Sequence, residues 1–216
     1  MHYYVVTGGP LTDKAFNVIK GGKVIAADRG IDFCRKHGIV PDLAVGDMDS
    51  VTNAGLKFLK EHDIPVKTFP VEKDMTDTEL AVDMVPAKSR ITVVCPLNGR
   101  IDHVIANLQL SAALHAKGRE IVLDDGITEV YFLSGNETVN VKLDRWGEDS
   151  AVSLIPLSFG NNVEGVTTKG LYYPLNDGTI ECGKTLSFSN KPKKGVSRFS
   201  ATIKSGILAV VITRAV

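Results

Sequence analysis

The stretch DLAVGDMDSVTNAGLKFLKEHD, residues 42–63, contains an apolar run, a turn with two aspartates and a helical pattern, in that order. The apolar run is short, as buried strands are, and a glycine closes it. NAGLKFLKEHD then spaces its apolar residues as a helix does. The stretch therefore predicts one strand, one turn and one helix, with Asp47 and Asp49 at the point where the strand ends.

The same succession of elements repeats from the start of the chain to about Asp125. The strand-like runs are residues 3–8, 23–28, 42–47, 66–70, 90–96 and 120–125. The helical patterns are residues 11–20, 30–38, 53–63, 76–84 and 102–118. Because strands and helices alternate, we predict an α/β domain in which helices cover both faces of a parallel sheet, in a Rossmann-like arrangement.

The pattern changes after Gly126, where helical periodicity stops. The strand-like runs are now residues 130–134, 138–144, 151–158, 165–175, 184–189, 197–203 and 206–214. Turn residues separate them at intervals of about 8–12 residues, which is typical of an antiparallel β-sandwich. We therefore expect a catalytic α/β domain over residues 1–128 and a β-sandwich domain over residues 129–216.

Composition excludes several classes of protein. The 216 residues are 44% apolar with zero formal net charge and no basic block, so we expect no nucleic-acid partner and no membrane partner. The three cysteines are far apart and form no CxxC motif, which favours a reducing compartment and excludes a cysteine-built metal site. Because MHYYVVTGGP lacks the features of a signal peptide, we expect a cytoplasmic protein.

Acidic residues follow four successive strands of the predicted sheet. Asp28 follows the second strand, Asp47 and Asp49 the third, Asp77 the fourth and Asp102 the fifth. The same loops also carry Lys73, Asp74, Arg100 and His103. Each aspartate alone is readily explained as a turn or helix-capping residue. Because ligands bind at the carboxyl edge of a parallel sheet, the set together predicts a shared site.

The residue types of this set narrow its chemistry. Carboxylates without cysteine, and with only His103 nearby, suit a hard cation such as Mg²⁺ or Mn²⁺ rather than zinc. Lys73 and Arg100 are then available for phosphate oxygens, although each alone is equally well read as a solvated surface charge. His103 either polarises a phosphate or begins a helix. The set favours an in-line phosphoryl transfer.

Two other motifs resemble phosphate-binding loops. Residues 178–185, GTIECGKT, match the P-loop pattern, but the sequence that follows alternates like a strand and contains proline. A P-loop needs a strand before it and a helix after it, so we interpret the motif as a turn and a strand. GGP at residues 8–10 either lets a phosphate approach the backbone or forms an ordinary turn.

The motifs AADRG, PDLAVGDMDS, EKDMTDTELA, NGRIDHVIANL and SFSN, in that order, resemble those of the thiamine pyrophosphokinase family. The resemblance covers almost the whole chain. It implies an N-terminal α/β domain that binds nucleotide and metal, a C-terminal β-sandwich domain that contributes to the thiamine site, and a homodimer with active sites between subunits. The implied reaction moves the pyrophosphoryl group of ATP to the hydroxyethyl oxygen of thiamine and releases AMP.

The resemblance also implies roles for individual residues. The residues implied to surround Mg²⁺ on the triphosphate are Asp28, Asp47, Asp49 and Asp77. Those implied to contact ATP or orient the attacking hydroxyl are Asp28, Lys73, Arg100, Asp102 and His103. The implied catalytic set is Asp47, Asp49, Asp77, Arg100 and Asp102, and Ser189 and Asn190 would hold the aminopyrimidine ring of thiamine. The paired acids of VGDMDS would thus tolerate each other because a cation lies between them and phosphates.

The chain departs from the family pattern at two places. Arg29 stands where the family commonly has the first glycine of ADGG, and CPLNGR keeps only Gly99 of a usually glycine-rich stretch. Both changes concern the approach of the backbone to the nucleotide. Alternative functions are pyrophosphate transfer to another alcohol, such as a hydroxymethylpterin, a metal-dependent phosphohydrolase, and a nucleotide-binding protein without catalysis.

Overall fold

The computed structural model of the protein describes residues 1–158 and 160–214, which form two compact units. The first unit contains residues 1–110 and 119–126, and the second contains residues 111–118 and the chain from Ile127 onward. The expected domain boundary between residues 128 and 129 stays a prediction. In the described ranges, no helix has both the length and the hydropathy that a membrane span requires.

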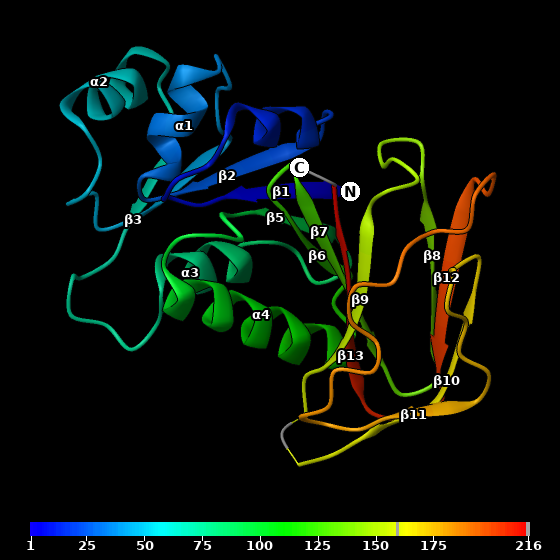
Figure 1. Cartoon of the computed structure of the whole chain (residues 1–216). Helices are drawn as coiled ribbons and strands as arrows, with labels where there is room; N and C mark the ends of the chain where they lie inside the picture. Colours follow the sequence, from blue (N-terminus) through cyan, green and yellow to red (C-terminus); the bar gives the residue numbers. More distant parts are fainter. Residues whose placement is uncertain (159, 215–216) are drawn as a thin grey trace. The chain divides into compact units, whose positions relative to one another are not determined.

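The first unit contains six parallel strands in the order β4-β3-β2-β1-β5-β6 (Figure 1). Their bounds are His2–Val6 (β1), Lys23–Ala27 (β2), Leu43–Gly46 (β3), Val66–Thr68 (β4), Arg90–Val94 (β5) and Ile121–Asp124 (β6). Small and β-branched side chains such as Val6, Ala26 and Ala44 fill the middle of this sheet and are fully buried. A strand buried on both faces needs such residues throughout, which is why these runs do not alternate with polar residues.

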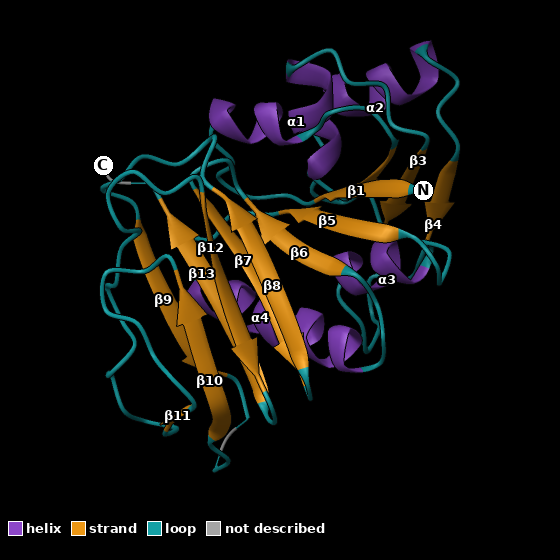
Figure 2. Cartoon of the chain, turned by 90° about the vertical axis from the view of Figure 1, so that its right-hand side faces the viewer, coloured by secondary structure: helices purple, strands orange, loops and turns teal. Residues whose placement is uncertain are grey.

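Helices cover both faces of this sheet, as Figures 1 and 2 show. They are Gly30–Lys36 (α1), Asn53–Glu61 (α2), Asp77–Asp83 (α3) and Ile101–Ala116 (α4). α1 and α2 lie on one face, and α3 with the first part of α4 lies on the other. The predicted α/β class, with a mostly parallel sheet, is confirmed.

The predicted helix over residues 11–20 is wrong. The segment forms a short 3-10 helix, Asp13–Val18, whose ends are closed by the bonds from Ala15 N to Thr12 O and from Ile19 N to Phe16 O. The Thr12 side chain accepts no capping hydrogen bond, and only Ala15 and Val18 of the 3-10 helix are buried. Without a cap and with a small buried face, the segment lacks what stabilises an α-helix.

A pair of polar side chains fixes how α2 begins. The Thr52 hydroxyl accepts a hydrogen bond from Gly55 N at 3.1 Å, so it caps the helix. Asp32 of α1 accepts a hydrogen bond from Thr52 N at 3.0 Å and a second from the Thr52 hydroxyl. The two helices on one face of the sheet are therefore joined at the N-terminus of α2.

The second unit contains two antiparallel sheet regions, with strand orders β7-β13-β9 and β11-β10-β12-β8. The bounds are Thr128–Ser134 (β7), Glu137–Lys142 (β8), Ala151–Pro156 (β9), Val163–Lys169 (β10), Gly178–Ile180 (β11), Arg198–Ile203 (β12) and Ile207–Thr213 (β13). Alternate side chains from both sheets, including Leu154, Phe199 and Leu208, form one buried core. The predicted antiparallel domain is confirmed.

Two predictions within the second unit need correction. Residues 184–189 are turns rather than a strand, and β10 ends at Lys169 instead of continuing to residue 175. Leu154 N donates to Ser187 O at 3.0 Å, and the Ser187 hydroxyl donates to Leu154 O at 2.6 Å, so a side-chain bond takes the place of the second backbone bond of a ladder pair. GTIECGKT contains β11 followed by turns, which agrees with our rejection of a P-loop.

The three cysteines are all free. Cys34, in α1, and Cys95, just after β5, are buried in the first unit, whereas Cys182 in the second unit is half-buried. Burial raises the pKa of both Cys34 and Cys95 to about 12. Both buried thiols are therefore protonated and unreactive at neutral pH.

Candidate active site

A cavity of about 540 Å³ lies at the carboxyl edge of the parallel sheet in the first unit. Its lining comes mainly from the loops after the first five strands of the chain and from the starts of the helices α3 and α4. The lining side chains used below are Thr7, Asp28, Arg29, Asp47, Ser50, Lys73, Thr76, Asp77, Asn98, Arg100, His103 and Asn107. The cavity is therefore where parallel sheets bind ligands, and most of the residues predicted from the first domain line it.

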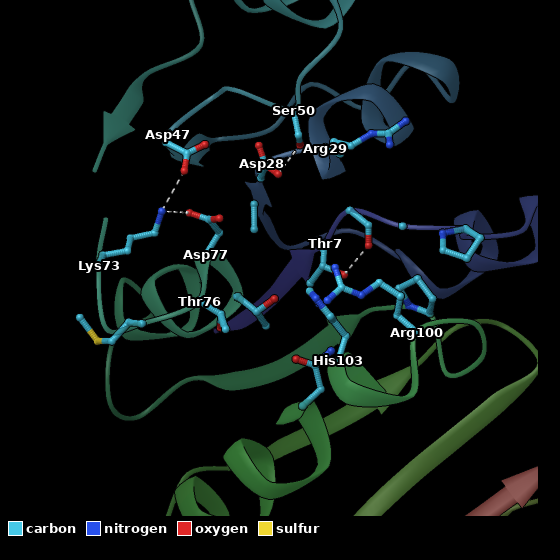
Figure 3. A pocket seen from close by; sticks show the side chains of 18 of the residues that line it. Thr7, Asp28, Arg29, Asp47, Ser50, Lys73, Thr76, Asp77, Arg100 and His103 are labelled. Carbon is cyan, nitrogen blue, oxygen red and sulfur yellow. Dashed lines mark hydrogen bonds and ion pairs between the residues drawn. The ribbon is translucent and has the colours of Figure 1, made fainter. Parts of the chain in front are cut away.

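Asp28, directly after β2, has a backbone conformation that only a minority of non-glycine residues adopt. Its φ is +46°, and its N–H donates to Val45 O at 2.8 Å, which holds the residue against the end of β3. The Ser50 hydroxyl donates to Asp28 Oδ2 (Figure 3). Among the described residues, the shielded Asp28 Oδ1 has no hydrogen-bond partner. One carboxylate oxygen is thus withdrawn from water and left unpaired.

Asp47 and Asp49 are close because the backbone turns sharply between them. Met48 has φ of +67°, and Asp49 N donates to Asp47 Oδ1 at 3.1 Å. This backbone bond, helped by Lys73, lowers the pKa of Asp47. The neighbouring Asp47 carboxylate raises the pKa of Asp49, and burial and the charges of Asp28 and Asp77 add to the increase. The turn therefore holds a repulsive pair of acids.

Lys73 lies between two of the carboxylates, as Figure 3 shows. Its Nζ is 3.1 Å from Asp47 Oδ2 and 3.2 Å from Asp77 Oδ1. The contact with Asp47 has hydrogen-bond geometry, whereas Asp77 Oδ1 has the charge contact alone. Burial raises the pKa of Asp77 against the opposing effect of Lys73, and the two carboxylates raise the pKa of Lys73 although burial alone lowers it. Lys73 is an internal counter-ion for this acidic edge.

Three of the four predicted metal ligands come together. One oxygen from each of Asp28, Asp47 and Asp49 lies within 4.8 Å of the other two. Asp77 lies beside this group, on the other side of Lys73. The unpaired Asp28 Oδ1 and the raised pKa of Asp49 both indicate charge that the chain itself leaves uncompensated. An all-carboxylate set of this kind fits a hard divalent cation.

Arg100 directly precedes α4, and Asp102 and His103 lie in its first turn, but the three side chains have different positions. Arg100 and His103 line the cavity, but Asp102 does not. Instead Asp102 accepts two hydrogen bonds from Arg100, at 3.2 Å from Nε and 2.5 Å from Nη2. This contact lowers the pKa of Asp102 and raises that of Arg100. Asp102 therefore orients the Arg100 guanidinium at the mouth of the cavity.

Glycines allow the backbone segments around the cavity to approach closely. A Cβ on Gly30 would lie 2.1 Å from Val6 O, so α1 can begin against β1 only with glycine there. Gly46, with φ of +141°, has Asp28 and Asp77 within 3.4 Å of its Cβ direction. Arg29 has ordinary helical angles, φ of −59° and ψ of −9°, so the backbone at that position does not require glycine.

Ser189 and Asn190 lie in the second unit. The buried Asn190 side chain accepts from Tyr173 N at 3.1 Å and Lys191 N at 2.8 Å, and donates to Tyr173 O at 2.7 Å. Ser189 is exposed with φ of +54°, and its N–H donates to Ser153 Oγ at 3.1 Å. The amide of Asn190 thus holds two segments of the unit together, next to a serine that faces solvent.

Sequence reasoning missed several polar residues that line the cavity. They are Thr7, Ser50, Thr76, Asn98 and Asn107. Ser50 is the last residue of the VGDMDS motif, and its position directly after Asp49 could have indicated that it belongs to the site. Thr7 follows β1 as the acids follow their strands, but threonine is also an ordinary strand residue. Asn107 lines the cavity from α4, and its place there could be recognised only once the helix was known.

Comparison with known proteins identifies both parts of the chain. The family model "Thiamin pyrophosphokinase, catalytic domain" matches residues 19–123, and "Thiamin pyrophosphokinase, vitamin B1 binding domain" matches residues 138–208. The thiamine pyrophosphokinase of Bacillus subtilis (strain 168) is 28% identical over 212 residues, which is 96% of either chain.

Solved structures agree over the full length. A thiamine pyrophosphokinase from Bacillus subtilis has a TM-score of 0.84 and 26% identity, with 100% of both chains covered. A thiamin pyrophosphokinase from Geobacillus thermodenitrificans has a TM-score of 0.81 and 28% identity, with 100% of this chain and 98% of the other covered. With two family models in the expected order and relatives matched end to end, the chain belongs to the thiamine pyrophosphokinase family.

Proposed function

We propose that the protein transfers the pyrophosphoryl group of ATP to the hydroxyethyl oxygen of thiamine, giving thiamine diphosphate and AMP in a Mg²⁺-dependent reaction. The observation that carries this proposal is the carboxylate cluster of Asp28, Asp47 and Asp49 at the edge of a cavity-bearing parallel sheet. The match of the second half of the chain to a vitamin B1 binding domain supports thiamine over a pterin as acceptor.

Asp28, Asp47 and Asp49 would hold the metal, and Asp77 would complete the acidic edge. Bound there, Mg²⁺ would neutralise charge on the triphosphate. The pairing of Lys73 with Asp47 and Asp77 suggests how the edge is balanced when no ligand is present. We propose that Lys73 keeps its place beside the acids and directs its remaining N–H groups to phosphate oxygens.

Arg100 and His103 would bind the triphosphate from the α4 side of the cavity. Asp102 acts on Arg100, because its two hydrogen bonds hold the guanidinium plane while the remaining N–H groups stay available. Catalysis by these residues is positioning and electrostatic stabilisation, since the attacking hydroxyl and the leaving AMP must lie in line through the transferred phosphorus.

Ser189 and Asn190 would contribute to the thiamine site from the second unit. Because the Asn190 amide is occupied by Tyr173 and Lys191, we propose that it shapes the segment while Ser189 presents polar groups to the aminopyrimidine. We also propose a homodimer. The three free cysteines support a cytoplasmic location, where thiols stay reduced.

One incubation tests the proposed reaction. The protein is mixed with ATP, Mg²⁺ and thiamine, and AMP and thiamine diphosphate are followed by chromatography, with thiamine-free and EDTA controls. We expect both products in equal amounts only when thiamine and metal are present. ADP or phosphate would instead indicate a monophosphoryl kinase or a phosphohydrolase, and turnover only with a hydroxymethylpterin would change the acceptor.

A further inference from the structure

Two hydroxyl–carboxylate pairs join the same two segments of the first unit. Asp28 pairs with Ser50, and Asp32 pairs with Thr52. The second pair lies four residues further along the chain on the aspartate side and two residues further on the hydroxyl side. Both pairs connect the β2–α1 segment to the β3–α2 segment. Only the first pair lies at the cavity, because Asp28 and Ser50 line it and Asp32 and Thr52 do not.

The role of the second pair in the fold accounts for all of its hydrogen bonds. Thr52 caps α2 through Gly55 N, and its own N–H and hydroxyl both donate to Asp32. Each Asp32 oxygen therefore has a partner, and removing the pair would weaken the start of a helix. This pair serves the fold.

The first pair has no such explanation. Ser50 is exposed and caps no helix, so its bond to Asp28 Oδ2 contributes little packing. The backbone bond to Val45 O and the left-handed φ hold the main chain of Asp28 but not the plane of its carboxylate. That plane turns about a broad, two-fold torsion, so a side-chain partner is needed to fix it.

We propose that Ser50 is a positioning residue: by holding Asp28 Oδ2, it leaves Oδ1 as the oxygen offered to a divalent cation shared with Asp47 and Asp49. The inference rests on the proposed metal-dependent function. The unpaired, shielded Oδ1 is the observation that supports it, since an oriented carboxylate with one free oxygen is a prepared ligand. Groups that hold a ligand in this way affect metal affinity by about 10–100-fold.

Mn²⁺ alone is the probe, because its free form is measured directly by electron paramagnetic resonance. Titration of the whole chain without nucleotide should give a dissociation constant about 10–100-fold higher for Ser50→Ala than for the unaltered protein. Ser50→Thr, which keeps a hydroxyl, should restore the affinity to within about threefold. The melting temperature of both variants should stay unchanged, because Ser50 is exposed.

Thr52→Val is the matched control, since it removes the neighbouring hydroxyl–carboxylate pair. We expect it to lower the melting temperature and leave Mn²⁺ affinity unchanged. Equal Mn²⁺ affinity for Ser50→Ala and the unaltered protein would overturn the inference, and so would a failure of Ser50→Thr to restore binding. If the unaltered protein binds no Mn²⁺, the proposed metal assignment is overturned as well. If it binds Mn²⁺ and Ser50→Ala does not change the affinity, only the role of Ser50 is overturned and the proposed function stands.

Discussion

Asp28 in the first unit and Asn190 in the second each hold side-chain polar atoms away from water, but they differ in whether those atoms have hydrogen-bond partners. The Asn190 amide makes three hydrogen bonds within its own unit. Asp28 keeps one shielded oxygen without a partner among the described residues. A buried polar group that is fully paired stabilises the chain, whereas one left unpaired costs free energy that a ligand can return. The difference separates residues that hold the fold from those prepared for chemistry.

The electrostatic surroundings of Asp28 and Asn190 differ as well. Asn190 is neutral, and its surroundings need no counter-ion. Beside Asp28, the Asp47 carboxylate raises the pKa of Asp49, whereas the backbone N–H of Asp49 and the Lys73 ammonium lower the pKa of Asp47. The acidic edge therefore stores repulsion in the absence of a ligand, and a cation would relieve it.

Asp49→Asn should have the largest effect, and only on chemistry. Transfer should fall by about 10³-fold, equivalent to about 4 kcal/mol of transition-state stabilisation. Stability without metal should not fall, because Asp47 already disfavours the charged form of Asp49. AMP formation and thermal melting measure the two effects, with Asp83→Asn as a control on the same unit. Near-normal transfer by Asp49→Asn would remove Asp49 from the site.

Asn190→Ala should have the next largest effect, on stability. It leaves two N–H groups and one carbonyl of Tyr173 and Lys191 without their partner, so the free energy of unfolding should fall by about 3 kcal/mol. Urea denaturation checks this, and Asn140→Ala, at an exposed position of β8, should lower the free energy of unfolding much less. A loss below about 1 kcal/mol would mean that the amide does not hold the two segments together.

Magnesium should stabilise the protein by about 2.7 kcal/mol at a concentration 100 times its dissociation constant. The effect depends on ionised carboxylates, so it should be full at pH 7 and vanish as the pH falls through the raised pKa of Asp49, above the ordinary value of 3.8. Without metal the sign reverses: ionising Asp49 is harder in the folded chain, so its contribution to stability falls as pH rises through that pKa. Thermal melting with MgCl₂, against NaCl of equal ionic strength, measures both trends. An equal shift with either salt would contradict the prediction.

Arg29→Gly should have the smallest effect. Because Arg29 already has helical angles, glycine relieves no strain and adds only backbone freedom in the unfolded chain. The free energy of unfolding should fall by less than about 1 kcal/mol. A larger loss, measured by urea denaturation, would mean that the Arg29 side chain itself supports the loop beside Asp28.

The sequence predicts the strands and helices of the first unit well, because apolar runs such as residues 43–46 and the helical spacing after Thr52 are local signals. It also predicts that Asp28 and Asp47 share one edge, since parallel strands end there together. It does not predict the Ser50 contact with Asp28, 22 residues away, because nothing local to either residue encodes that distance. The turns at residues 184–189 escaped prediction for a similar reason, because Ser187 bonds to Leu154 of β9, 33 residues away.

The positions of the three cysteines allow local opening of the chain to be measured by thiol labelling. Cys34 and Cys95 are buried in the first unit, and Cys182 is half-buried in the second. A thiol reagent should label Cys182 at once and reach the two buried cysteines only during transient opening of the first unit. The rate of the slow labelling phase would then report how often the first unit opens. Ligands that bind the first unit should lower this rate, and no added probe is needed to measure it.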